Sequence, residues 1–222
     1  MTETTQQMRN HWWWRPGWRV GRSFYTWHVT FEDQPAAHQL AADYAPVLDD
    51  LPTVDPIPAQ WLHLTMQGVG FTDEVDRTDV DAIVAAAQNR CAALAPFAIT
   101  LGPARVDPEA LMLPVRPPEP VTALRTAIRA AITDVWGPDS MPEDPHDFRP
   151  HVSLVYSNNT GPAEPITRRL TAHPMTSTEI TIHRASLIEL NRDHRIYEWT
   201  DVATADLSAP RTLPSGFNRS WR

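Results

Sequence analysis

The chain of 222 residues contains no lysine, because all 19 of its basic side chains are arginine. This absence excludes the lysyl-adenylate intermediate of ATP-dependent ligases, the Schiff base of pyridoxal enzymes and the lysine of P-loop nucleotide sites. Cysteine is nearly absent as well, since Cys91 is the single one, and no disulfide can form within the chain. Its position in a helical pattern predicts a small buried side chain.

Long apolar runs are also missing. No stretch reaches the roughly 18 apolar residues of a membrane-spanning helix, and the first residues lack the apolar segment of a signal peptide. We therefore expect a cytoplasmic protein that does not contact a membrane. The formal net charge is −8, so the surface as a whole repels nucleic acid. An RNA-type ligand must be short or be held by a local arginine cluster, and we expect no stable complex with a large nucleic acid.

The composition is that of a folded protein, with 42% hydrophobic and 21% charged residues, and the length suits one domain or two small lobes that share a core. We divide the chain into an N-terminal arm (1–22), a folded domain (23–203) and an irregular C-terminal tail (204–222). The arm contains the segment NHWWWRPGWRVGR, in which four tryptophans stand among four arginines, counting Arg9 just before it. These side chains suit base stacking and phosphate binding. Alternatively, the indoles pack over an exposed edge of the domain.

Hydrophobic periodicity predicts the order of elements in the domain. Strands are expected at 23–31, 61–71, 97–106, 111–115, 149–157, 177–190 and 195–202. Helices are expected at 35–51, 79–94, 120–136 and 165–172, and a proline-rich loop at 52–58. A strand–helix–strand unit occurs twice, which predicts an α+β protein whose two related halves face a cleft.

Two of the predicted strands carry a histidine followed two residues later by a hydroxyl, in WLHLTMQGVG and FRPHVSLVYS. Residues i and i+2 of a strand point to the same face, so His63 shares a face with Thr65, and His151 with Ser153. The hydroxyl can donate to a phosphate oxygen while the imidazole moves a proton. Two such strands facing each other would place one imidazole on each side of a phosphorus. Either histidine could be the acid or the base, and this chemistry requires neither metal nor cofactor.

Five further residues are candidates for binding a substrate. Arg149 could neutralise phosphate charge, and Gln67 continues the face of the first motif. Tyr156 lies on the opposite strand face from the second motif unless the strand bends, in which case its ring could stack on a base. Tyr25 is a similar stacking candidate, and His28 could be a third cleft residue or an ordinary strand histidine.

Other assignments remain open for the charged residues near the second motif. Arg149 could instead pair with Asp144 or Asp147 at the surface. A metal site at His146 and His151 with Asp144 lacks a second ligand cluster, so we expect no metal. Arg192 near the end of the domain is expected at the surface.

The two histidine segments resemble the paired signatures of the two-histidine (2H) phosphoesterase superfamily, which includes 2′-5′ RNA ligase-like proteins and cyclic phosphodiesterases. The resemblance covers about residues 23–203. It implies a bilobal fold with pseudo-two-fold symmetry, in which two antiparallel sheets flank a central cleft and helices lie outside. It also implies metal-free cleavage of 2′,3′-cyclic phosphates or 2′-5′ linkages of nucleotides or RNA ends, sometimes with reversible ligation. By motif position, His63 and His151 are then the catalytic pair, and Thr65 and Ser153 bind phosphate.

Two other functions compete with the enzyme. The chain could be a catalytically silent module that binds nucleotides or RNA ends in the same cleft. It could also be a globular protein with coincidental tripeptides, because the sequence holds a third copy of the pattern at His28-Val29-Thr30. Intact pairs in both halves favour the enzyme, since binding alone needs no second imidazole. The sequence does not indicate the oligomeric state.

Overall fold

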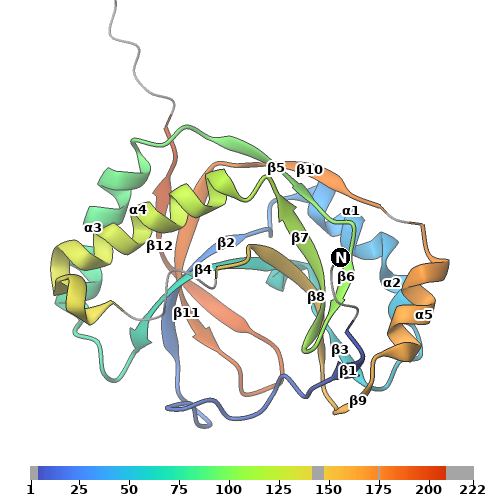
Figure 1. Cartoon of the computed structure of the whole chain (residues 1–222). Coiled ribbons are helices and arrows are strands. Elements are labelled where there is room, and N and C mark those ends of the chain that lie inside the picture. Colours follow the sequence, from blue (N-terminus) through green and yellow to red (C-terminus); the bar gives the residue numbers. More distant parts are fainter. Residues whose placement is uncertain (1–4, 142–147, 175, 209–222) are drawn as a thin grey trace, which may run out of the picture.

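Two antiparallel sheets lie at the centre of the computed structural model, which describes residues 5–141, 148–174 and 176–208 (Figure 1). The first sheet has four strands, in the order β12 (Glu198–Asp206), β11 (Arg184–Asn191), β2 (Phe24–Thr30) and β4 (His63–Phe71). The second sheet has the order β10 (Thr178–Ile182), β5 (Phe97–Leu101), β7 (Ala110–Arg116), β8 (His151–Ser157) and β3 (Val54–Pro56), and β6 (Arg105–Asp107) pairs with β7. The N-terminal arm is attached beside the second sheet by a short pair of strands, β1 (Gln7–Met8) and β9 (Gly161–Pro162).

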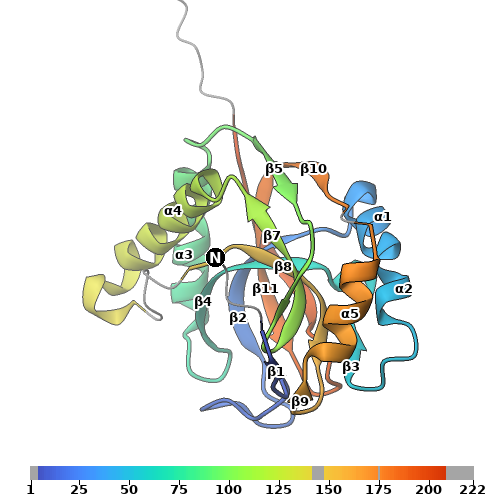
Figure 2. The same ribbon diagram turned by 45° about the vertical axis from the view of Figure 1, so that its right-hand side comes forward.

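Helices lie outside the sheets and complete two lobes (Figure 1 and Figure 2). Beside the four-stranded sheet, α3 (Arg77–Cys91) packs on β12 and α4 (Glu119–Trp136) packs on β4. The other lobe carries α1 (Pro35–Asp43), α2 (Ala45–Leu48) and α5 (Glu164–Ala172). Two 3₁₀ turns, at Ala59–Trp61 and Pro138–Ser140, follow β3 and α4. The predicted α+β fold, with two antiparallel sheets and helices outside, is confirmed.

Local sequence signals set the ends of the two long helices. The carboxylate of Asp76 accepts a hydrogen bond from the backbone N–H of Thr78 and so caps the first turn of α3. At the C-terminal end of α4, Gly137 has a φ of 81°, a conformation that residues with a side chain rarely adopt. The chain therefore leaves the helix at this glycine.

Strand β2 separates the hydrophobic core from the space between the sheets. Trp27 and Val29 are 0% and 4% exposed and pack in the main core, as alternate residues on one face. Thr26 and His28 point to the other face, where they line a cavity. The alternation of this strand therefore presents polar side chains to the space between the lobes and apolar ones to the core.

The structure corrects three predicted elements. The single strand expected at 177–190 is two strands, β10 and β11, which belong to different sheets because the chain crosses between the lobes near His183. The expected loop at 52–58 contains β3, an edge strand of the second sheet. The strand expected at 97–106 is interrupted at Gly102 and Pro103 and forms β5 and β6.

The C-terminal boundary also differs from the prediction. Strand β12 continues to Asp206, three residues beyond the expected end of the domain, and Leu207 packs in the main core. Residues 209–222, most of the predicted tail, lie outside the described part of the chain.

Candidate active site

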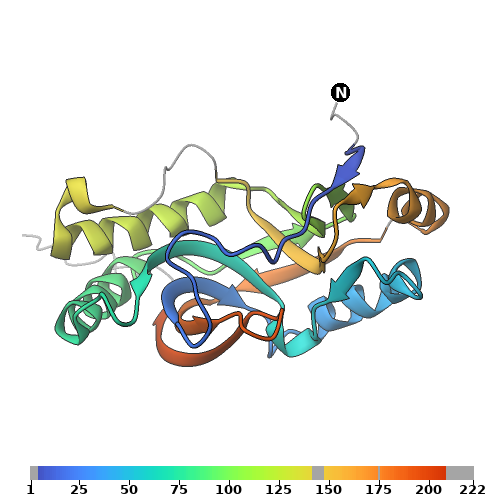
Figure 3. The same ribbon diagram turned by 90° about the horizontal axis from the view of Figure 1, so that it is seen from below.

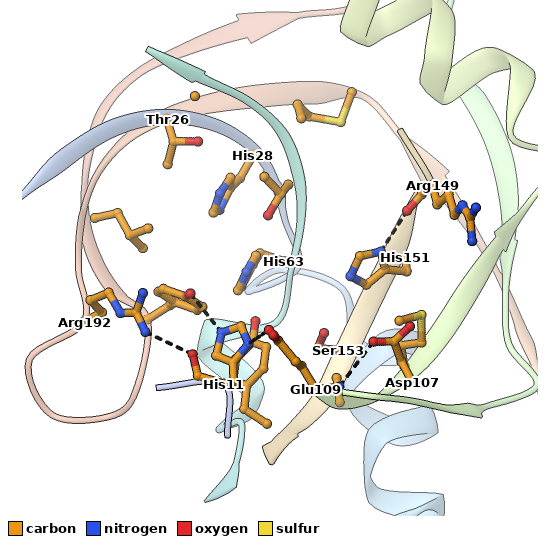
Figure 4. A pocket seen from close by; sticks show the side chains of 18 of the residues that line it. His11, Thr26, His28, His63, Asp107, Glu109, Arg149, His151, Ser153 and Arg192 are labelled. Carbon is orange, nitrogen blue, oxygen red and sulfur yellow. Dashed lines mark hydrogen bonds and ion pairs between the residues drawn. The ribbon is translucent and has the colours of Figure 1, made fainter. Parts of the chain in front are cut away.

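A cavity of about 760 Å³ lies between the two lobes (Figure 4). Strands β2 and β4 contribute His28, His63 and Thr65 to its wall. Strand β8 contributes His151 and Ser153 from the other side. The fold therefore brings the two predicted motifs, with both imidazoles and both hydroxyls, to one common space.

The same backbone contact holds His63 and His151. The Nδ1 atom of His63 lies 2.8 Å from the carbonyl oxygen of Trp61, and the Nδ1 atom of His151 lies 2.8 Å from that of Arg149. Because a carbonyl oxygen can only accept a hydrogen bond, each Nδ1 carries a proton and donates it. In both residues Nε2 is then the nitrogen that can exchange a proton with a ligand in the cavity.

His63 is enclosed by aromatic rings. It is 7% exposed and stacks on His28, with the ring centroids 4.6 Å apart and an angle of 7° between the planes. The edges of Tyr197 and Trp199 lie against it, at centroid distances of 5.8 and 5.5 Å. Burial, opposed by the backbone hydrogen bond and assisted by the positive charge of His151, lowers the pKa of His63 to about 4. His63 is therefore neutral near pH 7.

The surroundings of His151 are more open. Its ring is half-buried, and the preceding Arg149 is exposed and lines the cavity, as predicted from the sequence. The hydroxyl of Ser153 is buried, whereas Thr65 across the cavity is exposed. The alternative partners of Arg149, Asp144 and Asp147, lie outside the described residues, as does His146.

A β-bulge follows the hydroxyl residue in each motif. In β4, Thr65 pairs with His28 and Gln67 pairs with Trp27, so that Met66 is an extra residue between them. In β8, Ser153 and Val155 pair with neighbouring residues of β7, so that Leu154 is extra. A bulge shifts the alternation of side chains by one residue. The residue at i+3 from each hydroxyl, and not the one at i+2, therefore returns to the cavity.

These bulges decide two sequence predictions. Gln67 was expected beside His63, and this is wrong: the side chain is 0% exposed, lies outside the cavity wall and accepts a 2.6 Å hydrogen bond from Arg129. Tyr156 does reach the cavity, as expected if the strand bends. Its ring stacks on His11 of the N-terminal arm, at a centroid distance of 4.0 Å.

The two remaining candidates, Tyr25 and His28, lie on opposite faces of β2. Tyr25 packs in the main core together with Trp27 and does not line the cavity, so its predicted stacking role is wrong. The reason is the alternation of the strand, which directs residues 25, 27 and 29 away from the cleft. His28 does line the cavity. Burial lowers its pKa well below the usual value, and a positive charge on His63 adds to this effect.

Several cavity residues escaped the sequence prediction. From the N-terminal arm, His11 and Arg15 line the cavity, and from the β11–β12 connection Arg192 and Tyr197 do so. Arg192 was expected at the surface, which is wrong, because it is 4% exposed and held between aromatic rings. The density of tryptophan and arginine in the arm was the signal that could have identified this region.

Among the described residues, no three or more His, Cys, Asp or Glu side chains are grouped so that they could hold a metal ion. Within the same residues, no helix has the length and apolar character needed to cross a membrane.

Solved structures share the fold of this chain. The protein TT0787 of Thermus thermophilus superposes with a TM-score of 0.64 at 17% identity, over 84% of this chain and 99% of that protein. E. coli LigT in its apo form gives a TM-score of 0.60 at 14% identity, over 85% of this chain and 99% of LigT. LigT has also been crystallised with phosphate and with 3′-AMP. No curated protein matches the sequence.

A family model describes most of the domain. The model of the 2′-5′ RNA ligase superfamily matches residues 31–194, which include β4 and β8 with both histidine motifs. The N-terminal arm lies outside this match. On the family match, the shared fold and the paired motifs in one cavity, the chain belongs to the 2′-5′ RNA ligase superfamily, the 2H phosphoesterases.

Proposed function

We propose that the protein is a metal-independent phosphoesterase that opens 2′,3′-cyclic phosphates, or cleaves 2′-5′ linkages, at nucleotides or RNA ends. The observation that carries this proposal is the paired arrangement of His63 and His151 on facing strands, each with a fixed Nδ1–H and a hydroxyl neighbour. One phosphate between them would be reached by a proton acceptor and a proton donor at once.

The charge of the cavity wall supports an anionic substrate. Among the described residues, five arginines line the cavity: Arg15, Arg105, Arg125, Arg149 and Arg192. Two carboxylates, Asp107 and Glu109, oppose them. The cavity is thus positively charged, whereas the whole chain has a formal net charge of −8. Such local concentration of guanidinium groups suits a phosphate ester of limited size.

The different surroundings of the two imidazoles suggest their roles. His63, whose pKa is lowered to about 4, is the general base: its neutral Nε2 takes a proton from water, and the water oxygen attacks phosphorus. The bond from phosphorus to the 2′ or 3′ oxygen of ribose breaks, and His151 as imidazolium donates a proton to that oxygen. Thr65 and Ser153 donate hydrogen bonds to the non-bridging oxygens. The product is a nucleoside monophosphate, and both imidazoles return to their first state through solvent.

The relatives with solved structures agree with a small nucleotide ligand. E. coli LigT, which shares the fold, has been crystallised with phosphate, 3′-AMP and ATP. A nucleoside 3′-monophosphate is one of the two products that opening of a 2′,3′-cyclic phosphate would release. A ligand of this size also suits a cavity of about 760 Å³.

Turnover of nucleoside 2′,3′-cyclic monophosphates in excess EDTA tests the proposal. We expect hydrolysis to the 2′- or 3′-monophosphate, identified by phosphorus NMR, at a rate that EDTA does not change. Hydrolysis that appears only with an added divalent ion would contradict the metal-independent mechanism. Tight binding of the monophosphates without any turnover of cyclic or 2′-5′-linked substrates would instead indicate the nucleotide-binding module.

A further inference from the structure

The N-terminal arm, described from residue 5 to residue 22, connects the two lobes (Figure 1 and Figure 3), and its residues His11, Arg15 and Trp18 line the cavity. At its first end β1 pairs with β9, and the N–H of His11 donates to the carbonyl of Ser157. At its other end the guanidinium of Arg22 lies 3.6 Å from the ring centroid of Phe71 and donates to Asp73. The arm is therefore fixed to both lobes and forms part of the cavity wall.

His11 is the point at which the arm enters the cavity (Figure 4). Its Nδ1 lies 3.0 Å from a carboxylate oxygen of Glu109, and its Nε2 lies 2.9 Å from the hydroxyl of Tyr197. Burial, then the charges of Arg15 and Arg192, lower the pKa of His11 to about 3, so the ring is neutral. It therefore donates through Nδ1 to Glu109 and accepts the hydroxyl proton of Tyr197 at Nε2.

The cavity that His11 enters is also lined by Arg15, Arg192 and the two motif histidines, His63 and His151. Arg15 donates to the same Glu109 carboxylate as His11, and Arg192 donates to the backbone carbonyl of His11. A ligand with one phosphate between the motif histidines would therefore occupy the same cavity as the two arginines.

Arg15 and Arg192, which lie beside His11, have more hydrogen-bond donors than there are acceptors near them in the part of the chain that the structure describes. Arg15 donates to Glu109, which also accepts from His11, and 40% of its side chain remains exposed. Arg192 donates to the carbonyls of His11 and Trp13. Among the described residues, the buried Nε of Arg15, Nη1 of Arg192 and Nε1 of Trp12 have no acceptor.

Buried polar groups are normally hydrogen-bonded, so unpaired donors of this kind indicate a missing acceptor. The local charge is also incompletely compensated, because within the described ranges Arg15 and Arg192 share the carboxylate of Glu109 as their nearby negative charge, while His11 is neutral. An oxyanion would supply both the acceptors and the charge. Arg15 is exposed enough to contact it, and the buried Arg192 adds a second positive charge at the cavity wall.

We propose that Arg15 and Arg192 form a second anion site, which holds the phosphate on the 5′ side of the nucleotide whose 2′ or 3′ phosphate lies between His63 and His151. This inference rests on the proposed function, because it takes the phosphate between the two histidines as its reference point. The preferred ligand is then a nucleotide with two phosphates, or an RNA end whose last phosphodiester occupies the arm site. The arm gives the cleft this preference, and it lies outside the region that the family model matches.

Calorimetric binding of 3′-AMP and of adenosine 3′,5′-bisphosphate tests the second site without requiring turnover. The bisphosphate should bind the native protein about tenfold or more tightly than 3′-AMP, as expected for a charge-assisted contact. In Arg15→Gln the ratio of the two dissociation constants should fall to within about threefold of unity. In Arg15→Lys, which keeps the positive charge but loses the planar guanidinium group, the ratio should be intermediate. The dinucleotide ApAp distinguishes the source of the phosphate, because an Arg15-dependent gain for it shows that an RNA end fits.

Arg19→Gln is the matched control, because Arg19 belongs to the same arm, is exposed and does not line the cavity. It removes the same charge and should keep the native ratio. A native ratio near unity, or an equal fall of the ratio in Arg15→Gln and Arg19→Gln, would overturn the second site. Should the ratio behave as expected while neither cyclic phosphates nor 2′-5′ linkages are cleaved, the anion site stands and the proposed catalysis fails.

Discussion

The two histidine strands hold their imidazoles alike but surround them differently. In both, Nδ1 donates to the carbonyl two residues earlier, and a bulge follows the hydroxyl residue. His63 on β4 is buried among three aromatic rings, whereas His151 on β8 is half-buried beside an exposed arginine. The backbone thus fixes which nitrogen faces the ligand, and the buried surroundings of His63 lower the pKa of its ring.

The two strands also differ at the first residue beyond the bulge that faces the cavity again. The position three residues beyond the hydroxyl is Gly68 in the first lobe and Tyr156 in the second, and both line the cavity. Gly68 presents no side chain at this position, whereas the ring of Tyr156 provides the surface on which His11 stacks. The second lobe therefore contacts the N-terminal arm at the position where the first lobe has only backbone.

The unequal roles of the two histidines can be separated with a substrate whose leaving group needs no proton. His151→Ala should lose activity on a nucleoside 2′,3′-cyclic phosphate by on the order of a hundredfold or more, but lose less than about tenfold on uridine 3′-(p-nitrophenyl phosphate). His63→Ala should lose activity on both, because each reaction needs a nucleophile that gives up its proton, water with the cyclic phosphate and water or the 2′ hydroxyl with the p-nitrophenyl ester. Release of p-nitrophenolate and of monophosphate measures the two rates. Equal losses of His151→Ala on both substrates would contradict its assignment as the acid.

The buried state of His63 predicts the pH dependence of kcat/KM. The base must be neutral, so activity falls as the pH drops through the pKa of His63, which burial lowers to about 4. Between pH 5 and 7 the profile should therefore show no acidic limb from this residue. With an ordinary histidine pKa of about 6.5, the rate would fall by up to about tenfold for each pH unit below that value.

A variant that exposes His63 sharpens this test. Trp199→Ala removes one ring that covers the imidazole, so the pKa of His63 should rise and an acidic limb should enter the range above pH 5. An acidic limb near pH 6.5 in the native protein, unchanged in the variant, would contradict the assignment of His63 as the desolvated base.

The smallest effect on catalysis is expected at Gln67, which the bulge turns away from the cavity. Gln67→Leu removes the acceptor of the Arg129 hydrogen bond and should lower the free energy of unfolding by about 1–3 kcal/mol. Since the side chain does not line the cavity, kcat/KM should stay within about threefold of the native value. Urea unfolding and steady-state kinetics measure the two quantities.

Gln88→Leu is the control for this change, because Gln88 on α3 is exposed and its amide donates to the carbonyl of Thr204, a hydrogen bond that water can replace. It should lower the free energy of unfolding by less than about 1 kcal/mol and leave kcat/KM unchanged. Loss of activity in Gln67→Leu without loss of stability would show that Gln67 acts on the substrate after all.

The strand periodicity was enough to predict the central part of the cavity. The rule that residues i and i+2 share a face placed His63 with Thr65 and His151 with Ser153, and the fold brings both pairs together. The same rule failed at Gln67, because a bulge depends on pairing with the neighbouring strand and not on the strand's own sequence. The fold class followed from the repeated order of elements, but the split between β10 and β11 required knowledge of the sheets.

The contribution of the arm could not be predicted for a different reason. His11 meets Glu109 and Tyr197 across 98 and 186 residues of sequence, so no local pattern relates them. The tryptophan and arginine content of the arm favoured either ligand binding or packing against the domain. The structure combines these alternatives, because Trp12 and Trp18 pack on the domain while Arg15 lines the cavity.

The most direct test of the account compares the native protein with His63→Ala, His151→Ala and the double variant, with a nucleoside 2′,3′-cyclic phosphate in EDTA. If the two imidazoles act as one acid–base unit, each single change should lower kcat by on the order of a hundredfold or more, and the double change should cost little beyond the larger single loss. Metal-independent turnover that survives in either single variant at close to the native rate would contradict catalysis by the histidine pair.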